Sequence, residues 1–203
     1  MKWLSILISA TTALVSPTTG VALSEDRPSN DGNTTISQTV SDTNALTAVL
    51  EDWKNQTTFL EQQAAAHEQL VRNTERMTTA LAALRKTVGH TWYAYSGDTP
   101  SGWDCSGLVV WTYEQLGITV EHRADLQAHA GKVVTDPKPG DIMVFSADGG
   151  KTFYHSAIYL GNGQLVQALR PGTVTRIDPV GSDLFAGNTI RFIRIVETDP
   201  ANP

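Results

Sequence analysis

A heptad repeat of mostly apolar residues marks the first half of the chain. No proline or glycine occurs from about residue 42 to residue 87, and the repeat runs from Leu46 to Val88. Its members are Leu46, Val49, Trp53, Leu60, His67, Leu70, Thr74, Met77, Leu81, Leu84 and Val88. The spacing predicts one long amphipathic helix over residues 44–88, with a coiled-coil-like seam that His67 and Thr74 weaken. We expect its last turns to pack on the following domain. The rest is open between a spacer and a surface for a protein partner or self-association.

After Gly89 the pattern changes to short apolar runs separated by turn-forming residues. The runs predict strands of an antiparallel sheet at residues 142–145, 154–160, 164–169, 173–177 and 189–196. A helix is expected to begin at Cys105 and to end at Gly117, with Leu108 and Tyr113 on its buried face. A helix followed by consecutive strands predicts an α+β domain over residues 76–197, in which the cysteine helix packs on the sheet.

The N-terminal residues have the order of a secretory signal peptide. Lys2 precedes an apolar stretch at residues 3–15, and small residues follow up to residue 22. The apolar stretch is too short to span a bilayer as a helix. We therefore predict a signal peptide over residues 1–22 and a secreted protein. The alternative is an uncleaved anchor or a frayed terminal helix. Residues 23–43 are rich in Ser, Thr, Asn and Asp, which predicts a flexible linker.

Composition narrows the class of partner. The 203-residue chain carries a net charge of −6 and has no basic run, so nothing favours nucleic acid as a ligand. It also has a single cysteine, Cys105. Exported proteins normally use cysteines in disulfide pairs, so an unpaired thiol is either a buried bystander or a reactive group.

The residues around Cys105 favour the reactive group. At the start of a helix, free N–H groups and the helix dipole are expected to lower the pKa of the thiol. Asp104 can cap this helix, and the Cys105 N–H can donate to an oxyanion. Ser106 and Gly107 are expected to let a substrate approach the backbone closely.

A thiol nucleophile needs a base, and His155 is the best of five histidines because it lies on a predicted strand. A three-residue loop at residues 161–163 would pair Ala157 with Gln167 and place Gln167 one diagonal step from His155. The Gln167 carbonyl would then accept a hydrogen bond from the imidazole and fix its tautomer. The alternatives are a structural histidine and a solvent-facing glutamine.

Three motifs follow one another along residues 76–197. They are Gly102-Trp103-Asp104-Cys105-Ser106-Gly107-Leu108-Val109, Pro139-Gly140-Asp141-Ile142 and His155-Ser156-Ala157-Ile158-Tyr159-Leu160-Gly161. Together they resemble the NlpC family of papain-like cysteine peptidases, which are peptidoglycan endopeptidases. The resemblance implies a papain-like core with Cys105 as nucleophile, His155 as base and Gln167 as the residue that orients the base.

The same resemblance implies the substrate and its binding residues. The substrate is a peptidoglycan stem peptide, cut at the γ-D-glutamyl bond to the diamino acid, in the cell wall. No metal and no organic cofactor is implied. Tyr93, Asp104 and Ser106 are expected to bind the peptide, and Arg123 and Gln127 to support the site. The sequence departs from the family at two places: Gln167 stands where a histidine is usual, and Ser96-Gly97 replaces a Gly-Gly pair.

Three rival interpretations remain at this stage. His122, Asp125 and His129 have the spacing of metal ligands on one helical face. In the second interpretation the protein is a non-catalytic wall-associated scaffold, and the long helix is its functional segment. A papain-like amidase or acyltransferase would keep the cysteine chemistry and act on another amide.

Overall fold

The computed structural model describes residues 32–199, with side chains from residue 43 onward. The predicted signal peptide and the first part of the predicted linker lie outside the described residues. The chain divides into two compact units, Met1–Trp53 and Lys54–Pro203. The second unit contains the predicted α+β domain.

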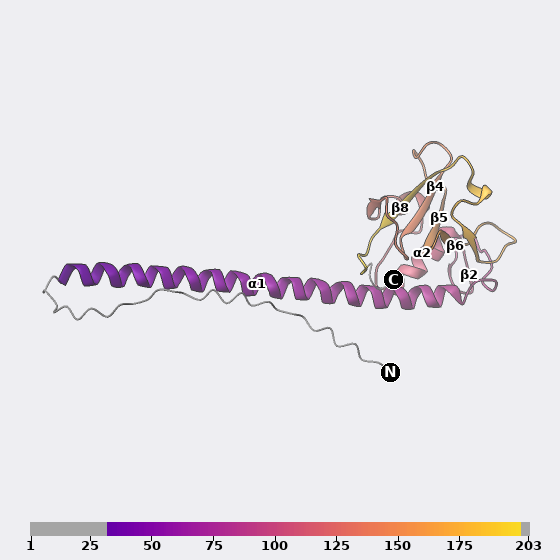
Figure 1. Cartoon of the computed structure of the whole chain (residues 1–203). Helices are drawn as coiled ribbons and strands as arrows, with labels where there is room; N and C mark the ends of the chain where they lie inside the picture. The colour runs from indigo at the N-terminus through magenta and orange to yellow at the C-terminus, as the bar shows by residue number, and fades with distance from the viewer. Residues whose placement is uncertain (1–31, 200–203) are drawn as a thin grey trace. The chain divides into compact units, whose positions relative to one another are not determined.

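Helix α1 spans Gly32–Arg85, so it begins well before the predicted residue 44 (Figure 1). The linker prediction is therefore wrong for residues 32–43. Composition was the misleading signal there, because no proline or glycine interrupts the chain between Gly32 and Gly89. Within residues 32–199, no helix combines the length and the hydropathy needed to cross a membrane.

The heptad stripe of α1 is buried only in its last turns. Met77, Leu81 and Leu84 belong to the domain core, and Leu84 is fully buried. Leu60, more than four turns before Met77, is 66% exposed. The prediction that the last turns pack on the domain is confirmed. A partner or a second copy for the exposed part stays a prediction.

The remaining elements of the second unit build two antiparallel sheets around one helix. The small sheet pairs β1 (Asp98–Thr99) with β2 (Gly102–Trp103). Helix α2 (Cys105–Glu114) follows, and then the short α3 (Ala124–Gln127). The six-stranded sheet has the order β3-β8-β4-β5-β6-β7. Its strands are β3 (Lys132–Val134), β4 (Ile142–Ser146), β5 (His155–Gly161), β6 (Gln164–Gln167), β7 (Arg176–Pro179) and β8 (Thr189–Arg194), and η1 (Asp183–Phe185) precedes β8.

Strand β7 begins and ends later than the predicted strand 173–177. Residues 173–175 pair instead with the segment that follows α1, where the Thr175 N–H donates to the Thr91 carbonyl at 2.8 Å and Trp92 bridges Val174. This difference carries Asp178 into the sheet. The small sheet and β3, both short, were not predicted.

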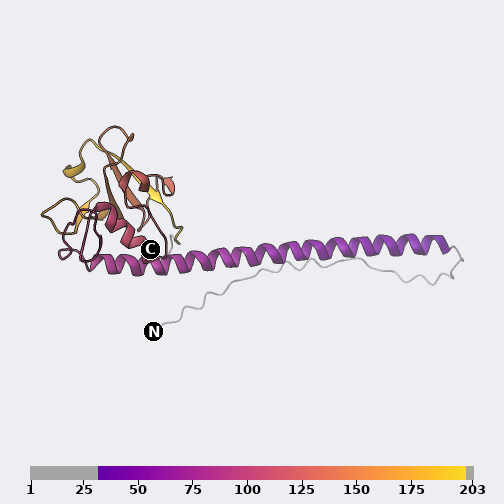
Figure 2. The same cartoon turned by 180° about the vertical axis from the view of Figure 1, so that it is seen from behind.

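Both faces of the sheet are covered, which explains the unbroken apolar run in β4. On one face, Ile142, Val144 and Ile158 pack with α2 and the end of α1. Figures 1 and 2 show α2 lying between the sheet and the last turns of α1. On the other face, Met143 and Phe145 form a second core that Phe185 of η1 joins.

The β5–β6 hairpin has the predicted register but reaches it differently. Ile158 pairs with Val166, as the prediction requires. The turn itself is a two-residue turn, with Asn162 at φ 52° and Gly163 at φ 69°. A bulge between Tyr159 and Gly161 then shifts the register by one residue. The two-residue turn and the bulge together produce the register that we had predicted from a three-residue loop.

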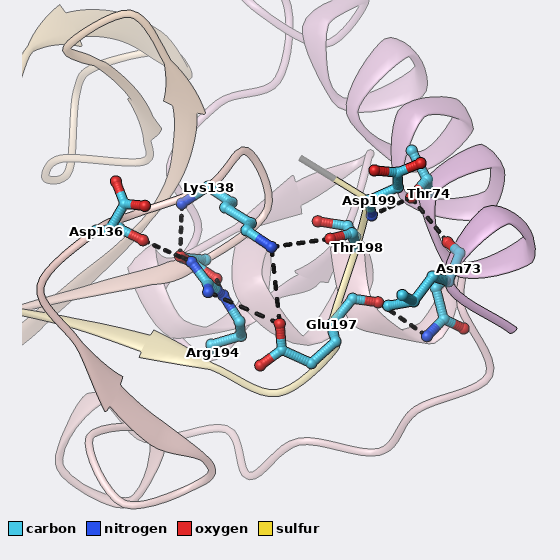
Figure 3. Close-up of polar contacts among 10 residues, drawn as sticks. Asn73, Thr74, Asp136, Lys138, Arg194, Glu197, Thr198 and Asp199 are labelled. Carbon is cyan, nitrogen blue, oxygen red and sulfur yellow. Dashed lines mark hydrogen bonds and ion pairs between the residues drawn. The ribbon is translucent and has the colours of Figure 1, made fainter. Parts of the chain in front are cut away.

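The segment after β8 is tied back to α1 and to the loop before β4 (Figure 3). The Asn73 amide donates to the Glu197 carbonyl at 3.0 Å, and the Asp199 N–H donates to the Thr74 hydroxyl at 2.7 Å. Thr74 is therefore a buried polar residue with a structural partner. Lys138 donates to the Thr198 carbonyl at 2.9 Å.

Truncating Leu84 should test whether α1 is part of the folding unit. Leu84→Ala removes a fully buried side chain, and we expect the free energy of unfolding to fall by about 2–5 kcal/mol. Leu60→Ala, an equal truncation at an exposed position, should change it by less than about 0.5 kcal/mol. Urea denaturation of the full chain measures both. Equal losses for the two variants would contradict the packing of α1 on the domain.

Candidate active site

Cys105 is the first residue of α2, and His155 is the first residue of β5. The two elements pack on each other. The N–H groups of Ser156 and Ser106 lie close enough to the Cys105 sulfur to favour its thiolate form. The nucleophile candidate therefore lies beside the residue that follows the base candidate. The thiol is half-buried and has no disulfide partner.

His155 is held between aromatic rings on the face of the sheet opposite α2. Its ring stacks on Phe185 at 5.6 Å between centroids and lies 5.3 Å from Phe145. Burial lowers the pKa of His155 to about 4, although Gln167 and the charge of Asp104 act in the other direction. The imidazole is consequently neutral at pH 7.

Gln167 accepts a hydrogen bond from His155 Nε2 through its Oε1, at 2.7 Å, as the register predicted. The glutamine is fully buried, so the solvent-facing alternative is excluded. Its own Nε2 donates to Asp178 Oδ2 at 2.7 Å, and Asp178 also pairs with Arg176. A polar chain thus crosses strands β5, β6 and β7 on one face of the sheet.

Asp104 organises the entrance to α2. Its side chain caps the helix by accepting from the Gly107 N–H at 2.8 Å, and it also accepts from Ser106 Oγ at 2.9 Å. His122 Nε2 lies 2.9 Å from the same oxygen, and the Ser96 N–H donates to the other oxygen. Burial alone would raise the pKa of Asp104, but the hydrogen bonds outweigh it and the pKa is lowered.

A cleft of about 500 Å³ opens at Cys105. The predicted substrate-binding residues Tyr93, Asp104 and Ser106 all line it. Asp104 and Ser106 are nearly buried and bonded to each other, so they shape the wall of the cleft. Burial raises the pKa of Tyr93, and electrostatic interactions with Cys105 and Asp104 add to this shift. Their contact with a substrate stays a prediction.

Glycine is required at position 107 for a different reason from the one we predicted. A Cβ at this position would lie 1.9 Å from the Gly97 carbonyl oxygen, so the close approach is between two segments of the chain. Ser96, which replaces the usual glycine, takes a left-handed conformation with φ 57°. Packing of the 96–97 turn on α2 explains these residues.

The two predicted supporting residues differ in their contacts. Gln127 is fully buried, and its Nε2 donates to the carbonyls of Ser106 at 3.0 Å and Glu121 at 2.8 Å. It therefore fixes the backbone next to Cys105. Arg123 is exposed at the rim of the cleft and lies 3.8 Å from Asp125.

The rival metal site does not form in the described part of the chain. Residues 32–199 contain no group of three His, Cys, Asp or Glu side chains placed to hold a metal ion. The helix that would align His122, Asp125 and His129 is only Ala124–Gln127, and His122 pairs with Asp104 instead.

A sequence model described as the NlpC/P60 family matches residues 90–194, just over half of the chain. The chain belongs to the NlpC/P60 family. The resemblance read from the three motifs is confirmed, as is the papain-like α+β fold class predicted from the helix-then-strands order and that resemblance.

Comparisons with individual proteins agree with this family assignment. The probable endopeptidase Rv2190c of Mycobacterium tuberculosis is 39% identical over 92 residues, which are 44% of this chain and 23% of the relative. A γ-DL-glutamyl hydrolase of Bacillus subtilis is 41% identical over 87 residues, which are 41% of this chain and 21% of the relative. The solved NlpC/P60 domain of the peptidoglycan hydrolase SagA matches with a TM-score of 0.50 at 30% identity, over 58% of this chain and 98% of that one. The chain thus spans less than a quarter of the length of these curated relatives.

Two residues of the site were not predicted as part of it. His122 was considered only as a metal ligand, because its bond to Asp104 joins segments 18 residues apart without a repeating pattern. Asp178 was missed because the predicted strand ended at residue 177. Extending that strand by two residues would have placed Asp178 diagonally from Gln167, by the reasoning that placed His155.

The expected lowering of the thiol pKa is wrong. Burial raises the pKa of Cys105, and the charge of Asp104 adds to this, while the N–H groups of Ser156 and Ser106 oppose it. Thiol and imidazole are therefore both neutral in the resting site.

The neutral thiol predicts slow alkylation. Because Cys105 is the only cysteine, iodoacetamide reports on it alone. We expect the alkylation rate at pH 7 to lie below that of free cysteine, with a midpoint shifted to higher pH. Urea-unfolded protein is the matched control and should react like free cysteine. A native midpoint below that of the unfolded chain would contradict the neutral resting pair.

The buried imidazole predicts a specific pH dependence of stability. A histidine with a pKa of 6.5 unfolded and about 4 folded binds its proton more readily when unfolded. Stability is therefore complete above pH 6.5 and falls as the pH drops to 4, by about 3 kcal/mol from this group. His155→Gln should lose this component, whereas His129→Gln, at an exposed position, should keep it. Denaturation at pH 7 and pH 4 measures the difference; equal pH dependence in wild type and His155→Gln would refute it.

Proposed function

We propose that this domain is a cysteine-type peptidoglycan endopeptidase of the cell wall. The single observation that carries the proposal is the packing of α2 on β5, which places the Cys105 thiol in the cleft and beside Ser156, the residue that follows His155. Family membership supports peptidoglycan as the substrate, because relatives named as peptidoglycan hydrolases and endopeptidases share this domain.

The first half-reaction starts from a neutral Cys105 thiol and a neutral His155 imidazole. Cys105 Sγ attacks the amide carbonyl carbon while its proton passes to His155, so charge develops only as the carbon–sulfur bond forms. The carbonyl oxygen becomes an oxyanion at the start of α2. Within residues 32–199 no hydrogen bond uses the Cys105 N–H, which leaves it to stabilise this charge. His155 then protonates the departing amine, and the carbon–nitrogen bond breaks.

The second half-reaction regenerates the thiol. The acyl part of the peptide is now a thioester on Cys105. His155 takes a proton from water, the resulting hydroxide attacks the thioester, and the thiolate leaves and recovers the proton from His155. No metal or organic cofactor takes part in these steps.

We propose the γ-D-glutamyl bond to the diamino acid as the scissile amide. The γ-DL-glutamyl hydrolase among the relatives supports this choice. Tyr93, Asp104 and Ser106 are assigned to binding of the stem peptide, because they line the cleft around Cys105.

Secretion to the cell wall belongs to the same proposal. A peptidoglycan substrate lies outside the cytoplasmic membrane, and the order of residues 1–22 is that of a secretory signal peptide. The exposed part of α1 is proposed as the segment that meets a wall protein or a second copy.

Digestion of purified peptidoglycan tests the activity. Wild type should release soluble peptides that carry a new D-glutamyl γ-carboxylate and a new diamino-acid amine, identified by mass. Cys105→Ala should lower the release at least about 10³-fold because the nucleophile is lost. Glu114→Gln, an exposed position at the far end of α2, should match wild type.

The other outcomes separate the rivals. Equal release by wild type and Cys105→Ala would contradict thiol catalysis. No release by folded wild type would favour the non-catalytic scaffold. Cleavage of another amide, abolished in Cys105→Ala, would keep the thiol hydrolase and replace the bond assignment.

A further inference from the structure

We propose that Asp178 is a positioning residue of the catalytic site, which sets the tautomer of His155 by orienting the Gln167 amide. The inference rests on the proposed function for its catalytic consequence, but its structural part does not depend on the substrate. It starts from a feature of glutamine: the amide has one accepting end and one donating end, and either end can face a histidine.

The geometry of β5, β6 and β7 places the three residues in a line. Gln167 pairs directly with Arg176, so Asp178, two residues along β7, lies diagonally across from Gln167 on the same face. His155 lies diagonally on the other side of Gln167 through β5, since Ile158 pairs with Val166. The hydrogen bonds from His155 to Gln167 and from Gln167 to Asp178, both of 2.7 Å, confirm the two diagonal steps.

An ionised carboxylate can only accept hydrogen bonds. Asp178 therefore attracts the NH₂ end of Gln167 and turns its carbonyl toward His155. A carbonyl can also only accept, so His155 Nε2 must carry the proton. In the neutral ring the lone pair is then on Nδ1, which no hydrogen bond among residues 32–199 engages.

The side chains of Gln167, Asp178 and His155 are buried, which leaves no competing hydrogen-bond partner for the Gln167 amide. Gln167 is fully buried, Asp178 is 4% exposed and His155 is 4% exposed. Arg176 pairs with Asp178 and compensates its charge. Water therefore has little access to satisfy a flipped amide, and the carboxylate decides the orientation.

Loss of the charge should free the amide to flip. In Asp178→Asn the new amide can accept as well as donate, so the Gln167 NH₂ group can turn toward His155 Nε2. That arrangement places the imidazole proton on Nδ1, where it blocks proton transfer from Cys105. A purely structural role for Asp178 would lower stability without changing the tautomer.

Two readouts test the proposal. In ¹⁵N-histidine-labelled protein, two-bond ¹H–¹⁵N correlations distinguish the tautomers, and His155→Gln assigns the signals. We expect the Nε2–H form in wild type and a mixture in Asp178→Asn. We also expect kcat on purified stem peptide to fall about 10- to 100-fold in Asp178→Asn, with KM changed less than about twofold. Glu114→Gln is the matched carboxylate-to-amide control and should match wild type in both readouts.

The charge swap gives the sharpest comparison. Gln167→Glu combined with Asp178→Asn moves the carboxylate one residue closer to His155 and places an amide donor behind it. The double variant should return to the Nε2–H tautomer and to within about fivefold of wild-type kcat, whereas Asp178→Asn alone stays low. This rescue also separates positioning from folding, because a structural defect at position 178 would persist in the double variant.

The results that overturn the proposal are equally specific. An Nδ1–H tautomer in wild type would overturn it, as would an unchanged tautomer and kcat in folded Asp178→Asn. A double variant whose tautomer and kcat are no closer to wild type than those of Asp178→Asn alone would do the same. If wild type cleaves no peptide, the proposed function fails, but the tautomer measurements still decide the role of Asp178.

Discussion

The register of the central sheet is the constraint on which the site depends. Side chains of β4 and β5 alternate between two covered faces, so a shift of one residue would exchange the contents of the two cores. The face toward α2 carries the main core and fixes that helix. The other face carries His155, Gln167 and Asp178. The nucleophile and the polar chain therefore come from opposite faces of the sheet, and the Cys105 thiol lies beside Ser156, which follows His155 in the chain.

Burial of this polar chain determines the electrostatics. The imidazole lies against Phe145 and Phe185, and burial keeps it neutral at pH 7. Burial and Asp104 also keep the thiol protonated, so the site does not hold a resting thiolate–imidazolium pair. A neutral glutamine is compatible with such a site, because it orients the ring without having to stabilise a permanent charge. The carboxylate of Asp178 lies one residue further out, where it accepts a hydrogen bond from the Gln167 amide.

Local patterns were sufficient to predict much of the fold and the centre of the site. The apolar runs placed β4, β5, β6 and β8 within a few residues, and glycines marked the hairpin. The pairing of His155 with Gln167 followed from register alone, although a turn plus a bulge produces that register. Family motifs pointed to Cys105 and His155 as a pair.

The predictions that were wrong concern features that depend on contacts between residues distant in the sequence. The pKa of Cys105 was predicted from the helix terminus, whereas burial by the rest of the fold decides its direction. Asp178 entered the site because residues 173–175 pair with the segment after α1, which no local pattern of β7 indicates. Gly107 was assigned to the substrate, but the Gly97 carbonyl occupies the space.

The most direct test of the central claim is to trap the thioester. Wild-type protein mixed with a stem peptide and quenched in acid within milliseconds should carry, in intact-mass spectra, the acyl part of the peptide on Cys105. The adduct should be absent in Cys105→Ala and released by hydroxylamine. Peptide cleavage that proceeds without any adduct, and that persists in Cys105→Ala, would contradict a covalent thiol mechanism.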